Sequence, residues 1–168
     1  MTPQCSYSKK SQSSLVLHPK KSKNLSVVTA ISKKGLIGIQ IVKGSITGTD
    51  FACFLLGIIK NHKDIEENLK EYYFFMDNAS IHKRISTQKF LHSINIFYNA
   101  PYSPFLNPIE NFFGLVKKQF RELQMVNPEK KFLNVLKAFK TIKKDAVQKT
   151  IRKSWKEMLK CLNGDPYF

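Results

Sequence analysis

Two short and almost wholly apolar runs constrain the fold of this chain more than any other feature. The first, Tyr72–Met76, ends directly at Asp77, and the second, Ile94–Tyr98, leads into a loop rich in proline. Short apolar runs that stop at polar or turn residues are typical of buried strands. We therefore predict two buried strands, with a helix near Lys83–Ser93 between them.

β-Branched residues predict a hairpin before these strands. Leu25–Ile31 is the first predicted strand, Gly35 turns the chain, and Leu36–Val42 is the second strand. Asp50–His62 then carries apolar residues at helical spacing, and Thr49 is its predicted N-cap.

Proline shapes the chain after the second buried strand. The loop at 100–108 is predicted to be irregular, because proline cannot donate a backbone hydrogen bond in a ladder or a helix interior. A helix resumes from about Pro108, since proline is tolerated in the first turn. Its predicted apolar stripe consists of Ile109, Phe112, Phe113, Val116 and Phe120. One or two more helices are expected after Pro128.

The order of hairpin, helix, strand, helix, strand and further helices predicts an α/β fold with a mixed sheet flanked by helices. Such a sheet usually has its functional site at the strand ends. We divide the chain into an irregular basic lead-in at residues 1–24, a core at residues 25–126, and a C-terminal helical extension packed on that core at residues 127–168.

The charge balance favours a polyanionic partner. Lys and Arg number 28 against 12 Asp and Glu, which gives a net charge of +16. Basic side chains that neutralise phosphates release condensed counterions, so nucleic acid is the leading partner. A merely soluble basic protein, or the residue bias of an AT-rich genome, is the alternative.

Other classes of protein are disfavoured. Cys5, Cys53 and Cys161 lie far apart with no C-x-x-C spacing, so neither a zinc knuckle nor a disulfide framework is expected. The longest apolar stretch, near Phe51–Ile59, is too short to cross a bilayer, and Met1–Lys10 lacks the apolar segment of a signal peptide. We expect an intracellular protein with no membrane partner.

Two acids stand where a sheet edge could gather them. Asp77 follows a predicted strand directly, and Glu110 lies in the first turn of the helix behind the proline loop. Two or three converging carboxylates are a minimal site for Mg²⁺. The competing interpretations are a turn residue for Asp77 and a partner of the helix dipole for Glu110.

The sequence around these acids is specific. FFMDNASIHK followed by YNAPYSPFLNPIENFFGLVK resembles the second and third catalytic blocks of mariner-like transposases of the DDE type, whose domain has a ribonuclease H-like fold. The spacing of the blocks is close to that of the family and slightly shorter. The matching positions are Asp77, Asn78, His82, Pro101, Tyr102, Ser103, Pro104, Leu106, Asn107, Pro108, Ile109 and Glu110.

The resemblance implies a function in DNA transposition and integration. Asp77 and Glu110 would be metal ligands for Mg²⁺, or for Mn²⁺, in a two-metal site. The reaction would be hydrolytic nicking of DNA, followed by attack of the freed 3′-hydroxyl on a target phosphodiester. The partners would be the phosphate backbone and the transposon ends, which implies a nuclear or otherwise DNA-associated location.

Four more residues of these blocks are candidates for support or DNA contact. Asn78 either orients Asp77 or touches DNA, or it caps the following helix. His82 is either a catalytic or DNA-contacting residue or an ordinary surface or core histidine. Tyr102 and Asn107 are expected to shape the loop that delivers Glu110.

The family carries a further Asp on its opening strand, and no counterpart is evident here. Residues 1–49 contain no Asp and no Glu. The first acid, Asp50, is better explained as a first-turn helix residue, while Glu66, Glu67 and Glu71 look like a solvated face. We expect the opening strand and the upstream helix-turn-helix region to be missing, as in a truncated product, a decayed copy or a fragment.

Three functions compete on this basis. The leading one is a transposase catalytic domain with impaired activity, and the second is a non-catalytic DNA-binding or assembly remnant. The third is an unrelated basic α/β protein that binds RNA, although neither an RNP-like aromatic strand nor a Gly-rich KH loop is evident. A homodimer and a complementing transposase chain are both open as protein partners.

Overall fold

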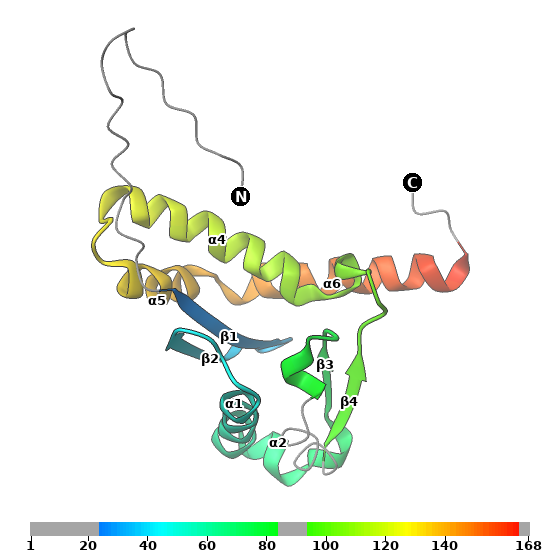
Figure 1. Cartoon of the computed structure of the whole chain (residues 1–168). Coiled ribbons are helices and arrows are strands. Elements are labelled where there is room, and N and C mark those ends of the chain that lie inside the picture. The colour runs from blue at the N-terminus through cyan, green and yellow to red at the C-terminus, as the bar shows by residue number, and fades with distance from the viewer. Residues whose placement is uncertain (1–23, 84–93, 165–168) are drawn as a thin grey trace, which may run out of the picture.

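The computed structural model describes residues 24–83 and 94–164. Its two β-sheets lie among the helices as Figure 1 shows. In chain order the elements are β1 Leu25–Ser32, β2 Gly35–Lys43, α1 Gly48–Asn61, α2 Lys63–Glu67, η1 Leu69–Glu71, β3 Tyr73–Met76, η2 Ser80–Lys83, β4 Asn95–Tyr98, η3 Pro104–Leu106, α4 Pro108–Val126, α5 Lys131–Thr141 and α6 Lys144–Asn163, where η denotes a 3-10 turn.

The predicted hairpin is confirmed. β1 and β2 pair antiparallel from Leu25 opposite Lys43 to Ser32 opposite Gly35. Gly35 has a φ of 113°, a value that favours glycine because it has no Cβ, and this conformation closes the tight turn.

The two apolar runs form a second, parallel sheet. Tyr73 lies opposite Asn95 and Met76 lies opposite Tyr98. The predicted α/β class is confirmed, with both parallel and antiparallel pairing. Within the described residues, however, the strands are divided between two sheets, β1–β2 and β3–β4.

The first helix begins earlier than predicted. Thr47, and not Thr49, is the N-cap of α1, because its hydroxyl accepts from the backbone of Asp50 while the Asp50 carboxylate accepts from the backbone of Thr47. These hydrogen bonds from Thr47, the backbone one foremost, hold the pKa of Asp50 below its usual value. Asp50 is therefore a capping residue, as its position suggested.

α1 and the second sheet share one core. The buried residues of α1 face inward at helical spacing, and Met76, Phe74 and Ile96 of the second sheet pack against them. At Gly38 of β2 an added Cβ would lie 3.0 Å from Ile58, so the helix approaches the hairpin closely. The buried residues of this core are Phe51, Phe54, Leu55, Ile58, Ile59, Ile65, Met76 and Ile94.

A second core lies on the opposite side of the hairpin. Helices α4, α5 and α6 form a layer over β1 and β2 (Figure 1), and of the one or two helices expected after Pro128 the structure has two, α5 and α6. The predicted stripe of α4 faces this core. The buried residues of the core are Phe112, Val116, Ala138, Phe139 and Val147.

Two other expectations need correction or fall outside the structure. The strand at Tyr72–Met76 is not fully buried, since Tyr73 is 62% exposed and Phe75 38% exposed. Both side chains line a cavity instead of packing in either core. The helix expected near Lys83–Ser93 lies almost entirely outside the described residues, as does the lead-in before Asn24. No helix among the described residues is long and apolar enough to cross a membrane.

Candidate metal and DNA site at the end of β3

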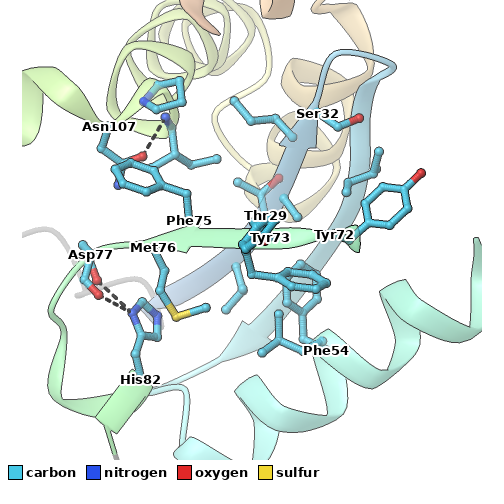
Figure 2. A pocket seen from close by; sticks show the side chains of 18 of the residues that line it. Thr29, Ser32, Phe54, Tyr72, Tyr73, Phe75, Met76, Asp77, His82 and Asn107 are labelled. Atoms are coloured by element: carbon cyan, nitrogen blue, oxygen red, sulfur yellow. Dashed lines mark hydrogen bonds and ion pairs between the residues drawn. The ribbon is translucent and has the colours of Figure 1, made fainter. Parts of the chain in front are cut away.

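Asp77 lies at the point where β3 ends. Its side chain is 51% exposed, and its Oδ1 accepts a hydrogen bond of 2.9 Å from the backbone of Ala79. The same oxygen lies 2.9 Å from Nδ1 of His82, and Figure 2 shows the two side chains pointing toward one another. Asp77 therefore has the turn geometry that its position predicted, and it keeps an accessible carboxylate.

His82 is fixed from two sides. Its Nδ1 lies 3.2 Å from the backbone carbonyl of Asp77 as well as facing the carboxylate. Its ring packs on Phe51 of α1 with centroids 4.2 Å apart. This geometry places the His82 ring between Phe51 and the Asp77 carboxylate, and a catalytic or DNA-contacting role for His82 stays a prediction.

Asn78 and Asn99 join the ends of the two strands. The Asn78 amide donates to the carbonyl of Asn99, whose own backbone N–H donates to Met76 over 2.8 Å. The Asn99 side chain donates to the Ser103 carbonyl over 2.7 Å, which anchors the proline loop. Sequence reasoning missed Asn99, although it follows the second apolar run closely, much as Asp77 follows the first.

The proline loop leads into α4 and so positions Glu110 in the first turn of that helix. Asn107 is only 3% exposed, and its Oδ1 accepts from the backbone of Ile109 over 3.2 Å, so it caps α4. Glu110 lies in the first turn of that helix and is exposed. Tyr102 has a φ of 57° and a fully exposed side chain, so its backbone shapes the turn while its ring faces solvent.

Both acids line one cavity. Its volume is about 950 Å³, and its wall includes Asp77, His82, Asn107 and Glu110. Within residues 24–83 and 94–164, no basic side chain forms an ion pair with Glu110. Two carboxylates free of Lys and Arg suit a hard divalent cation. That their oxygens lie side by side stays a prediction.

Among the described residues, the possible donors at this end of the cavity are the carboxylates of Asp77 and Glu110 and the His82 ring. No group of at least three His, Cys, Asp and Glu side chains in the described part of the chain is placed to hold a metal ion. The carboxylates of Asp77 and Glu110 are of the chemical type that binds hard divalent cations.

The opposite end of the cavity carries a different cluster. Lys34 in the hairpin turn forms an ion pair with Asp64 of α2, and the Tyr72 hydroxyl donates to the same carboxylate over 2.8 Å. The Lys34 ammonium, with Tyr72 second, holds the pKa of Asp64 below its usual value. All three residues line the cavity wall and tie the end of β1 to the start of β3.

Basic side chains cover the helical layer. The described residues contain three ion pairs, two with lysine and one with His82, so most lysines have no acidic partner. Many of these cations lie on α4 and α6 and in the turn between α5 and α6. The exposed ones include Lys117, Lys118, Arg121, Lys143, Lys144, Lys149, Arg152, Lys153 and Lys156.

Comparison with known proteins identifies relatives. A family model described as DDE superfamily endonuclease matches residues 1–133. The Tc3 transposase of Caenorhabditis elegans, a transposable-element protein, is 30% identical over 128 residues, which are 73% of this chain and 38% of that protein. The chain thus spans well under half the length of this relative.

Solved structures show the same fold. A pre-cleavage Mos1 transpososome matches 98% of this chain and 52% of its own chain, at 18% identity and a TM-score of 0.67. The catalytic domain of Mos1 mariner transposase matches 84% of this chain and 74% of its own, at 18% identity and a TM-score of 0.62. The fold is accordingly the ribonuclease H-like fold of that domain. Together with the match over residues 1–133, this likeness shows that the chain belongs to the DDE superfamily endonuclease family.

Proposed function

We propose that this chain is the catalytic-core part of a mariner-like transposase, in which Asp77 and Glu110 bind Mg²⁺ or Mn²⁺ beside DNA. One observation carries the proposal: the acids of the two family blocks, which are far apart in sequence, line the same cavity at the end of β3. A divalent cation bound there would polarise a phosphodiester and lower the pKa of a bound water. A solved structure of the Mos1 catalytic domain is described as containing Mg.

The chain's own residues would prepare this site. His82 holds one oxygen of Asp77 and leaves its other oxygen available to a cation. Asn107 fixes the helix start that carries Glu110, while Asn78 and Asn99 hold the strand ends together. The basic surface of the helical layer would bind the phosphate backbone of transposon-end DNA. A location with DNA in the nucleus follows from this partner.

A second function has its own support. The described residues supply no third acid near Asp77 and Glu110, and residues 1–49 contain none. A chain that keeps the basic surface without a complete ligand set would act as a DNA-binding or assembly remnant of a transposase, alone or with a second transposase chain.

Titration with Mn²⁺, followed by electron paramagnetic resonance of the free ion, tests the proposed metal site. Asp77→Asn and Glu110→Gln are each expected to weaken Mn²⁺ binding by at least about tenfold, because even indirect support of a metal ligand is worth that much. Glu66→Gln, which changes an exposed acid on α2, is the matched control and should leave the affinity unchanged. Equal Mn²⁺ affinities in the unchanged chain and its three variants would contradict the proposed metal site.

A further inference from the structure

A buried serine of α6 lies beside the start of α4. Ser154 is only 1% exposed and lies near the middle of α6. Figure 1 shows the start of α4 lying beside this part of α6. A hydroxyl that is buried so completely costs free energy unless it forms hydrogen bonds. The hydrogen-bond partners of Ser154 therefore indicate what this side chain does in the fold.

Ser154 contacts both the segment before Glu110 and the residue after it. Its Oγ donates to the carbonyl of Phe105 over 3.3 Å and accepts from Nδ2 of Asn111 over 3.5 Å. Phe105 belongs to η3, which leads into α4, and Asn111 follows Glu110 directly. Both hydrogen bonds are long, so each is weak by itself. Together they join α6 to the two sides of the first turn of α4.

The Asn111 amide is held in one orientation. Its Oδ1 accepts from Nζ of Lys153 over 3.3 Å, while its Nδ2 donates to Ser154. An ammonium group can only donate, and Ser154 uses its single proton for Phe105, so Lys153 must face the amide oxygen and Ser154 the amide nitrogen. Two successive residues of α6 therefore hold the side chain next to Glu110.

The hydrogen bonds of η3 and of the helix start extend this restraint to Glu110. Phe105 lies within η3, and this turn ends at Asn107, whose backbone N–H donates to Pro104 over 3.0 Å. The backbone N–H of Glu110 donates to the carbonyl of Asn107 over 3.2 Å. A shift of the Phe105 carbonyl would therefore move the first turn of α4 and the carboxylate that this turn carries.

A second buried hydroxyl of α6 provides a comparison. Thr150 is 7% exposed, and its Oγ1 donates to the carbonyl of Val147 over 2.7 Å. This hydrogen bond stays within α6, whereas those of Ser154 lead to η3 and to α4. Replacement of Thr150 thus tests the loss of a buried hydroxyl from the same helix.

We propose that Ser154 is a positioning residue for Glu110. Through Phe105 and Asn111 it fixes the first turn of α4, and with it the place of the Glu110 carboxylate in the cavity wall. A carboxylate binds a small divalent cation only when its oxygen approaches to about 2 Å, so a displaced turn would weaken the binding. The effect on the cation rests on the proposed function, whereas the restraint on the turn does not.

Titration of the full chain with Mn²⁺ tests the positioning. Ser154→Ala removes the hydroxyl without weakening α6, because alanine is the best helix former. The Mn²⁺ affinity is expected to fall about threefold or more, since two weak hydrogen bonds are lost. Thr150→Val, which removes the other buried hydroxyl, is the matched control and should leave the Mn²⁺ affinity unchanged. Equal losses in the two variants would overturn the proposal, because they would reflect a general loosening of α6.

Combined variants separate positioning of Glu110 from a general effect on the site. If Ser154 acts through Glu110, Ser154→Ala should weaken Mn²⁺ binding about threefold in the Asp77→Asn protein. The same substitution should leave Mn²⁺ binding unchanged in the Glu110→Gln protein, where no carboxylate remains to be positioned. Equal weakening in both proteins would contradict an action through Glu110.

Hydrogen exchange without metal separates this inference from the proposed function. Ser154→Ala is expected to speed exchange of the Ile109 and Glu110 amides, which both donate to Asn107, about threefold or more, and Thr150→Val should not. Faster exchange, with a Mn²⁺ affinity that neither Ser154→Ala nor Glu110→Gln changes, would uphold the restraint and contradict the metal site. Unchanged exchange, with a Mn²⁺ affinity lowered only by Glu110→Gln, would overturn the role of Ser154 and leave the metal site intact.

Discussion

Purified alone with Mg²⁺ or Mn²⁺, the chain is expected to leave duplex DNA uncut. Phosphoryl transfer of this type depends almost wholly on positioned cations, and two ions are needed to serve the attacking and the leaving oxygen together. Asp77 and Glu110 would hold at most one ion weakly. Among the described residues β1 pairs with β2 and β3 pairs with β4, so the described strands do not join the two sheets beside the site.

An assay for nicking of supercoiled plasmid DNA tests whether the chain lacks cleavage activity. Three proteins are compared: the chain as it stands, the chain extended upstream by a family-like strand that bears Asp, and the same extension with Asn in place of that Asp. Activity is expected only in the protein that bears the Asp, and Asp77→Asn should abolish it. Metal-dependent nicking by the unextended chain, lost in Asp77→Asn, would show that its ligand set is sufficient.

Binding to duplex DNA is expected to be strong at low salt, nearly independent of sequence and steeply weakened by salt. The net charge of +16 and the unpaired lysines of α4 and α6 supply the contacts. Each phosphate contact contributes about −0.9 to the slope of log affinity against log salt, so about six contacts lower the affinity roughly a thousandfold between about 50 and 200 mM salt.

Fluorescence anisotropy over a salt series measures this slope. Replacing an exposed cation of α6, as in Arg152→Ala, should weaken binding to all DNA sequences alike. It should also make the slope of log affinity against log salt shallower by about one, the contribution of a single phosphate contact. Asp145→Asn, on the same helix, removes an acid and is the control that should not weaken binding. An affinity for DNA that does not change with salt would contradict DNA as the partner. An equal affinity for single-stranded RNA would instead support the RNA-binding alternative.

Local patterns were sufficient to predict most elements of this fold. The β-branched residues on both sides of Gly35 predicted the hairpin, and the apolar stripe of α4 predicted both the helix and its buried face. These features depend on periodicity within one segment. The start of α1 was misplaced because the hydrogen bonds between Thr47 and Asp50, and not the polarity of Thr49, decide where the helix begins.

Contacts between segments that are distant in sequence could not be predicted. The blocks around Asp77 and Glu110 singled out both acids, but the position of His82 on Phe51 and the anchor at Asn99 depend on tertiary packing. The exposure of Phe75 could not be predicted either. Its aromatic run predicts a buried strand, and the exposure of its side chain depends on how other segments pack against the sheet formed by β3 and β4.

The shared metal site of Asp77 and Glu110 is tested most directly by anomalous diffraction from crystals soaked in Mn²⁺. Metal to oxygen distances near 2 Å require a Mn²⁺ peak within about 2.5 Å of a carboxylate oxygen from each residue. We expect one such peak at the end of β3, absent in Asp77→Asn. A peak that contacts neither carboxylate, or the two carboxylates on opposite faces of the sheet, would contradict the account.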